Sequence, residues 1–192
     1  MIYVATTNEH KVHEIMDILS DFNLELLKSP KKVDVEEDGK SFFENSVKKA
    51  YYYGMELNNP VICDDSGLVI NALGGMPGVE SARFMEGYSY EEKMKELLRR
   101  LQNFDDKSAS FVCVATYFNP NNGVLISAEG IVNGTISDNI RGKFGFGYDP
   151  FFIPEGYDKT FGELGESVKR QISHRSRAFR KLFELLKKVG EI

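Results

Sequence analysis

The chain has 192 residues, of which 42% are hydrophobic and 28% charged. This is ordinary for a soluble globular protein with one domain, or one domain in two lobes. No apolar run approaches the roughly 20 residues that cross a bilayer, and the N-terminus lacks the features of a secretion signal, so we expect a cytoplasmic protein without a membrane partner. The net charge of −5, from 29 acids and 24 bases, argues against nucleic-acid binding.

The first predicted strand covers residues 2–6, and a helix begins near Lys11 directly after it. Thr7 or Asn8 would cap this helix. A strand-to-helix turn presents free backbone N–H groups that suit a phosphate, and Lys11 adds a cation. A purely structural turn is an equally good interpretation, because no glycine-rich signature is present. The helical spacing is carried by Val12, Ile15, Met16 and Leu19.

The next segment contains a short strand, an acidic loop and a second helix. The strand is predicted at residues 24–27, and the polar loop at 28–40 contains the acidic run 36–38. Such a run is usually a solvated loop, and a metal ligand is the less common alternative. The helix is predicted from residue 41 to 53 and closed by Gly54. Its apolar face would consist of Phe43, Val47, Ala50 and Tyr51.

An acid pair follows the apolar run at 61–63. We expect a buried strand that ends at Asp64 and Asp65, at an edge where α/β sheets bind ligands. Two acids there are costly unless a cation or hydrogen bonds satisfy them, which indicates a metal-assisted site. If the strand continued, the two side chains would point to opposite faces, so one acid would face the site and the other would support it. Cys63 and Cys113 are predicted as buried free thiols.

The middle of the chain predicts a glycine-rich loop, a helix and a long hairpin. The loop covers residues 71–79, and Ser89 caps an amphipathic helix that runs to Leu101. The nearly continuous apolar run at 109–118 indicates a central strand that is covered on both faces. A partner strand at 124–132 completes the hairpin, and residues 130–136 continue or kink it.

Two further blocks carry chemistry. Residues 145–154 place aromatic side chains between glycines, either as an aromatic plug or as a wall on which Phe146 or Tyr148 stacks against a heterocycle. Before the last helix, Ser173 is a candidate N-cap, and His174 and Arg175 would lie at the positive end of the helix dipole. Positive charges at the positive end of a helix dipole are unfavourable without an anion, so we favour a polyphosphate ligand. The core face of this helix is predicted as Phe179, Leu182, Phe183 and Leu186.

These features together describe a nucleotide site. Carboxylates suit Mg²⁺, basic side chains suit phosphates, and an aromatic wall suits a base. No Walker motif, dinucleotide fingerprint or nucleophilic triad is present, so hydrolysis by metal-activated water fits better than covalent catalysis.

Five motifs carry a resemblance to a known family: TTNEHK at 6–11, DDSGL at 64–68, GGMPGVESAR at 74–83, FGYDP at 146–150 and SHR at 173–175. In order and spacing, the chain resembles the non-canonical purine nucleoside triphosphate pyrophosphatases, the inosine/xanthosine triphosphate pyrophosphatase family. The resemblance covers essentially all 192 residues. It implies an α/β fold with an elongated mixed β-sheet flanked by helices, in two lobes with a central cleft. It also implies a homodimer, with residues 1–192 as one pyrophosphatase domain.

The resemblance also implies the chemistry: Mg²⁺-dependent hydrolysis of ITP, dITP and XTP to the monophosphate and pyrophosphate. Asp65 is implied as general base and metal ligand, and Glu36 as metal ligand, although Glu37 could be aligned instead. The alternatives are a pyrophosphatase for pyrimidine or modified nucleotides on the same scaffold and a non-enzymatic nucleotide-binding module. The implied substrate-binding residues are Thr7, Asn8, Lys11, Ser66, Phe146, Gly147, Tyr148, Asp149, Lys169, His174 and Arg175.

Overall fold

The computed structural model describes all 192 residues, which divide into two compact units. Unit 1 consists of Met1–Ser66, Cys113–Gly130 and His174–Ile192, and unit 2 of Gly67–Val112 and Ile131–Ser173. No helix combines the length and apolar character that a membrane span requires. The interpretation of the chain as a single pyrophosphatase domain stays a prediction.

The strands form one six-stranded mixed sheet in the order β2-β1-β3-β4-β5-β6. β1 is parallel to β2 and β3, whereas β5 and β6 are antiparallel. The predicted α/β class with a mixed sheet flanked by helices is thus confirmed. The strands are β1 (Ile2–Val4), β2 (Leu26–Lys28), β3 (Val61–Ile70), β4 (Ser108–Asn119), β5 (Val124–Ile136) and β6 (Phe152–Pro154).

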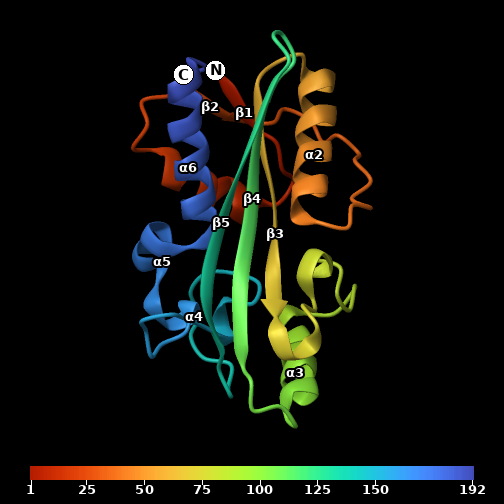
Figure 1. The fold of residues 1–192 in the computed structure, drawn as a ribbon, viewed down its shortest axis with the longest axis vertical. Coiled ribbons are helices and arrows are strands. Elements are labelled where there is room, and N and C mark those ends of the chain that lie inside the picture. The colour runs from red at the N-terminus through yellow and green to blue at the C-terminus, as the bar shows by residue number, and fades with distance from the viewer. The chain divides into compact units, whose positions relative to one another are not determined.

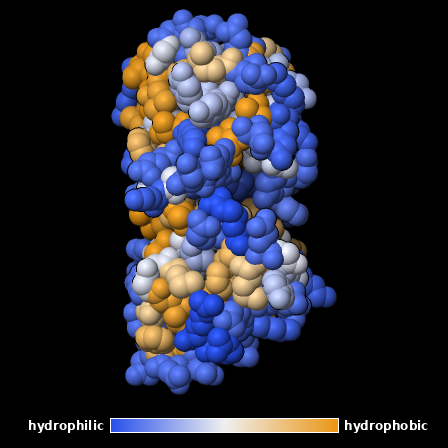
Figure 2. All heavy atoms as spheres, turned by 90° about the vertical axis from the view of Figure 1, so that its right-hand side faces the viewer, coloured by the Kyte–Doolittle hydropathy of each residue, from blue (hydrophilic) through white to orange (hydrophobic).

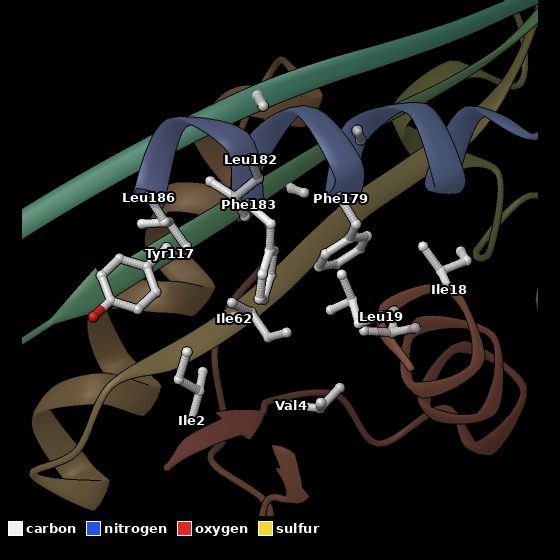
Figure 3. Packing of buried hydrophobic residues seen from close by; sticks show 14 of the residues in the cluster. Ile2, Val4, Ile18, Leu19, Ile62, Tyr117, Phe179, Leu182, Phe183 and Leu186 are labelled. Atoms are coloured by element: carbon white, nitrogen blue, oxygen red, sulfur yellow. The ribbon is translucent and has the colours of Figure 1, made fainter. Parts of the chain in front are cut away.

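Unit 1 has helices on both faces of its strands (Figure 1). α1 (Glu9–Leu19) and α6 (His174–Val189) pack on one face and α2 (Phe42–Leu57) on the other. Strand alternation separates the two cores, because Ile62 faces α1 and α6 while Val61 and Cys63 face α2. Figure 3 shows the first core, in which the predicted apolar face of α6 lies over β1, β3 and β4. All four residues of that face are fully buried: Phe179, Leu182, Phe183 and Leu186.

Unit 2 has its own apolar core, built around α3 (Tyr90–Leu101). Ser89 caps α3 as predicted, in a reciprocal capping box with Glu92. The core also contains Phe111, Phe152 and Phe161, whose rings contact one another. The shorter helices of this unit are η1 (Asn71–Leu73), η2 (Gly78–Glu80), η3 (Asp149–Phe151), α4 (Phe161–Leu164) and α5 (Glu166–Ile172).

Several predicted boundaries need correction. β3 is one uninterrupted strand from Val61 to Ile70, so Asp64 and Asp65 lie within the strand and not at its end. Gly54 does not close α2, which continues to Leu57 and is capped by Asn58 in the left-handed conformation. Gly54 instead lets the helix pack closely on β4, because a Cβ there would lie 2.5 Å from a ring carbon of Phe118. The predicted hairpin is confirmed, and β5 continues to Ile136.

The buried face of α2 also differs from the prediction. Phe43 and Tyr51 are exposed, and only Ala50 of the expected apolar face is buried. Asn45 and Ser46 are completely buried instead. Figure 2, which turns the right-hand side of Figure 1 toward the viewer, shows mainly hydrophilic residues with apolar ones between them. The exposed apolar residues of α2 are Phe43, Tyr51, Tyr52 and Met55.

Candidate active site

Asp64 and Asp65 point to opposite faces of β3 and have different partners. Asp64 contacts side chains from α1 and α6, and Asp65 contacts side chains from α2. This division follows from the alternation of side chains along a strand. The expectation that the two acids separate in a continuing strand therefore agrees with the structure.

Asp64 is the centre of a buried ion-pair cluster in unit 1. Its Oδ2 lies 3.1 Å from Lys11 Nζ and 3.2 Å from an Arg175 Nη. Burial alone raises the pKa of Asp64, but Lys11 and Arg175 outweigh it and hold the pKa well below its usual range. Arg175 is itself buried, pairs with Glu14 and donates to Ser66 Oγ at 2.8 Å. The charge of Arg175 is thus compensated by carboxylates of the protein.

His174 and Arg175 are the first two residues of α6, whose first turn packs on β5 in unit 1. A Cβ at Gly130 on β5 would overlap the His174 carbonyl oxygen and the Ala178 amide nitrogen. Glycine at this position therefore allows the first turns of α6 to lie directly on β5. His174 and Arg175 are both buried as a result.

Asp65 lies in a second polar cluster, on the α2 face of β3. Asn45 Nδ2 donates to its Oδ2 at 3.2 Å, and Lys49 Nζ lies 3.1 Å from its Oδ1. Lys49 Nζ also lies 3.0 Å from Glu37 Oε2, so one ammonium group bridges two carboxylates. Burial lowers the pKa of Lys49, but Asp65, Glu37 and Asp64 raise it more, so Lys49 stays charged. Burial raises the pKa of Asp65, against the opposing charges of Lys49 and Lys11.

The acidic loop places its three carboxylates differently. Glu37 reaches Lys49, and Asp38 pairs with Lys48. Glu36 is exposed, and its electrostatic effect falls on Lys48. The structure therefore associates Glu37 with Asp65, and the role of Glu36 as a metal ligand stays a prediction.

The carboxylates of Asp65 and Glu37 can accept a divalent cation. No group of three or more histidine, cysteine, aspartate or glutamate side chains is arranged to hold a metal. Mg²⁺, however, is commonly bound by one or two carboxylates together with water and substrate phosphates. The Lys49 ammonium between the two carboxylates shows that this position favours positive charge. The donor set thus fits Mg²⁺.

The N-terminus of α1 is the predicted phosphate-binding turn. Asn8 is the N-cap, and its side chain accepts from the backbone amides of His10 and Lys11. Thr7 and Asn8 are exposed, and Lys11 is partly exposed. This helix N-terminus combines a positive dipole end with the Lys11 ammonium, as the sequence predicted.

In unit 2, the turn at residues 145–149 is held by Asp149. Its Oδ2 accepts from the Phe146 amide at 2.8 Å and from Lys169 Nζ at 2.6 Å. A Cβ at Gly145 would overlap the same oxygen, and Gly145 and Gly147 both have positive φ, so this turn requires glycine at both positions. Lys169 Nζ lies 4.6 Å from the centre of the Phe146 ring. Phe146 is only partly buried, so one ring of the predicted aromatic wall remains accessible.

Tyr148 has a different position from Phe146. It is buried in the core of unit 2, and its ring packs edge-on against Tyr90 with 5.1 Å between centroids. Its hydroxyl donates to the Ser81 carbonyl at 2.8 Å. Of the two rings that the sequence offered for stacking on a heterocycle, Phe146 is the one that the structure favours. Tyr148 anchors the turn to the segment 78–83.

Removal of the Tyr148 hydroxyl (Tyr148→Phe) is expected to lower the free energy of unfolding by about 1–3 kcal/mol, because the buried Ser81 carbonyl loses its donor. Urea denaturation measures this change. Tyr157 is exposed and in the same unit, so Tyr157→Phe is the matched control, with an expected change within about 0.5 kcal/mol. Equal effects of the two substitutions would contradict the anchoring role of Tyr148.

Sequence reasoning missed three residues that contact the predicted site: Glu14, Asn45 and Lys49. Asn45 and Lys49 are four positions apart on a helix and therefore share a face. This spacing could have identified them, because their helix lies in the sequence between the acidic loop and the strand that carries Asp64 and Asp65. Glu14 lies one turn after Lys11 but carried no comparable signal.

Comparison with known proteins identifies the family. A model of the Ham1 family matches residues 2–185. The chain belongs to the Ham1 family. A dITP/XTP pyrophosphatase from Aquifex aeolicus is 43% identical over 196 residues, with 97% of this chain and 96% of the relative covered. A dITP/XTP pyrophosphatase from Clostridium perfringens is 44% identical over 199 residues, with 97% of each chain covered.

Solved structures of Ham1 proteins also have the fold of this chain. A HAM1 protein from Coxiella burnetii superposes with a TM-score of 0.89 at 34% identity and covers 97% of this chain and 98% of its own. The Ham1 protein of Staphylococcus aureus gives a TM-score of 0.87 at 37% identity, with 100% of this chain and 99% of its own covered. This membership agrees with the resemblance drawn from the five sequence motifs.

Proposed function

We propose that this Ham1 chain is a nucleoside triphosphate pyrophosphatase of the cytoplasmic nucleotide pool. It hydrolyses dITP, ITP and XTP to the monophosphate and pyrophosphate. The supporting observation is the buried Asp65, whose two oxygens are fixed by Asn45 and Lys49, in a chain whose Ham1 relatives are dITP/XTP pyrophosphatases. The predicted domain of two lobes over residues 1–192 and the homodimer belong to this proposal, and light scattering of the purified chain tests the homodimer.

Asp65 is the proposed general base. It takes the proton of a water molecule whose oxygen attacks the α-phosphorus, and the bond from that phosphorus to the bridging oxygen of pyrophosphate breaks. Burial raises the pKa of Asp65, which makes the carboxylate a better proton acceptor. Asp65 with Glu37, or Glu36 as the resemblance implies, would hold Mg²⁺. When bound, Mg²⁺ neutralises phosphate charge and lowers the pKa of water.

The triphosphate is assigned to residues of unit 1. Thr7 and Asn8 offer the N-terminus of α1, and Lys11 offers an ammonium group that is partly exposed. Ser66 contacts the substrate through its hydroxyl. Arg175 contacts Asp64, Glu14 and Ser66, so it also keeps Asp64 and Ser66 in place.

The purine base is assigned to the turn at 145–149 and its neighbours. Phe146 stacks on the ring, and Lys169 Nζ, held by Asp149, supplies positive charge beside it. Gly147 and Tyr148 shape the turn. His174 is a substrate-binding residue by the resemblance alone. Protein donors near the purine 6-position would donate to the keto oxygen of hypoxanthine or xanthine and would mispair with the amino group of adenine.

A substrate panel tests the function. With Mg²⁺, we expect rapid release of pyrophosphate from dITP and XTP, slow release from dATP, dTTP and UTP, and loss of activity when EDTA removes the metal. A preference for dTTP or UTP would support the pyrimidine alternative. Binding of ITP without release of pyrophosphate would support a non-enzymatic binding module. Either result would overturn the proposal.

A further inference from the structure

Asn45 is a completely buried polar residue at the first turn of α2, and both ends of its side-chain amide are engaged. The Oδ1 atom accepts from the backbone amide of Gly39 at 2.8 Å, and Nδ2 donates to Asp65 Oδ2 at 3.2 Å. The backbone N–H of Gly39 can only donate and the carboxylate of Asp65 can only accept, so the orientation of the amide follows from its partners. Asn45 thus connects the acidic loop to the proposed general base.

Glycine at position 39 is required for this contact. A Cβ there would lie 2.5 Å from Asn45 Oδ1 and 2.9 Å from Glu44 Cβ, so any side chain would displace the amide. The φ angle of Gly39 is not in the left-handed region, so close approach is the reason for glycine and not backbone strain. The end of the acidic loop and Asn45 therefore fit together closely.

Neighbouring residues of α2 hold the rest of the acidic loop. Lys48 pairs with Asp38 and Lys49 with Glu37, so three side chains of one helix bind three consecutive residues of the loop. Only Asn45 and Lys49 also reach Asp65. Lys49 has a long side chain and is partly exposed, whereas Asn45 is short and fully buried. Asn45 therefore has fewer side-chain torsions than Lys49 and less room in which to move.

We propose that Asn45 is a positioning residue, which fixes the plane of the Asp65 carboxylate and its distance from the acidic loop. This inference rests on the proposed role of Asp65 as general base. A base must point its lone pair at the proton that it accepts, so a rotated carboxylate reduces the rate of the chemical step. The N-terminus of α1 does not depend on Asn45, so binding of the phosphates should be preserved.

Asn45→Asp tests this role with little change in side-chain volume. It keeps an acceptor for the Gly39 amide but replaces the donor to Asp65 with a second carboxylate oxygen. We expect kcat for dITP to fall about 10- to 100-fold, the range typical of residues that orient a reactive group, while KM stays within about twofold. An unchanged kcat in folded Asn45→Asp protein would overturn the proposal.

Ser46→Ala is the matched control. Ser46 is the next residue of α2, is equally buried and bonds to Thr116 at 2.7 Å, not to Asp65. Its loss should lower the melting temperature, as we also expect for the Asn45 substitution, but leave kcat within about twofold. A comparable fall in kcat in both variants would show that Asn45 acts only through stability and would overturn the proposal.

Two further measurements test the proposal if Asn45→Asp does not fold or if the chain has no pyrophosphatase activity. If Asn45→Asp does not fold, Gly39→Ala displaces the same amide from the loop side, and an unchanged kcat there would overturn the proposal. If the unaltered chain releases no pyrophosphate, the proposed function fails, and the position of the carboxylate is read from the ¹³C resonance of the Asp65 carboxyl carbon. That resonance should move in Gly39→Ala but not in Ser46→Ala, and an unmoved resonance in Gly39→Ala would overturn the inference.

Discussion

Asp65→Asn is expected to reduce the turnover of dITP by about 10²- to 10⁴-fold, the contribution typical of a general base. The amide is nearly the same size as the carboxylate but accepts no proton at neutral pH. Binding should change much less than turnover, because the N-terminus of α1 and Lys11 also hold the phosphates. Steady-state kinetics with dITP gives kcat and KM, and equilibrium binding of a non-hydrolysable α,β-imido analogue gives the affinity.

Asp38→Asn provides the control for Asp65→Asn. Asp38 also pairs with a lysine of α2, but it belongs to the exposed part of the acidic loop and does not contact Asp65. Its turnover should stay within about twofold of the unaltered chain. Near-normal turnover in Asp65→Asn would contradict the assignment of Asp65 as the base. Glu37, which shares Lys49 with Asp65, would then become the candidate.

The sequence predicted correctly those elements whose apolar residues are placed only by packing in the core. The apolar face of α6 is correct at every position, because this helix packs on strands through large aliphatic and aromatic residues. The hairpin of β4 and β5 is also correct, because its apolar strands are long and a turn of asparagine, proline and glycine separates them. The short helices α4 and α5 were missed, because four to seven residues are too few to show a helical period.

The helix α2 was predicted, but its buried face was wrong, because that face carries polar residues that contact Asp65 and the acidic loop. A pattern of apolar residues was expected to face the core, and Phe43 and Tyr51 were assigned there. The structure buries Asn45 and Ser46 and exposes both aromatic residues. The polar face satisfies Asp65 and the acidic loop, which apolar side chains cannot do. Sequence rules tend to fail at positions that function has selected, and here the failure itself marks the residues next to Asp65.

The site was predicted as a set of residues, and the structure shows the surroundings of each of them. Phe146 is accessible, whereas Tyr148 is part of a core. Arg175 was assigned to a polyphosphate because a positive charge at the positive end of a helix dipole is unfavourable without an anion. Its partners, Asp64 and Glu14, are more than a hundred residues away along the chain. No local pattern reveals ion pairs at that separation.

Arg175→Met is expected to lower the free energy of unfolding by about 3–5 kcal/mol, the cost of breaking a buried ion pair from one side. Methionine retains the apolar part of the side chain but leaves the fully buried Asp64 with less positive charge around it and Ser66 Oγ without its donor. Urea denaturation monitored by circular dichroism measures the change. The control is Arg180→Met on the same helix, which removes an exposed pair with Asp21 and should cost no more than about 1 kcal/mol.

A double-variant cycle separates the Asp64–Arg175 ion pair from the loss of packing. Asp64→Asn combined with Arg175→Met removes both charges, so its cost should be smaller than the sum of the single costs by about 0.5–3 kcal/mol. Burial alone lowers the pKa of Arg175, but Asp64 and Glu14 raise it more, so the guanidinium is charged and the pair is a true ion pair. Strictly additive costs would show that Arg175 stabilises the chain through packing alone. Its charge would then remain available for the phosphates, as the sequence first indicated.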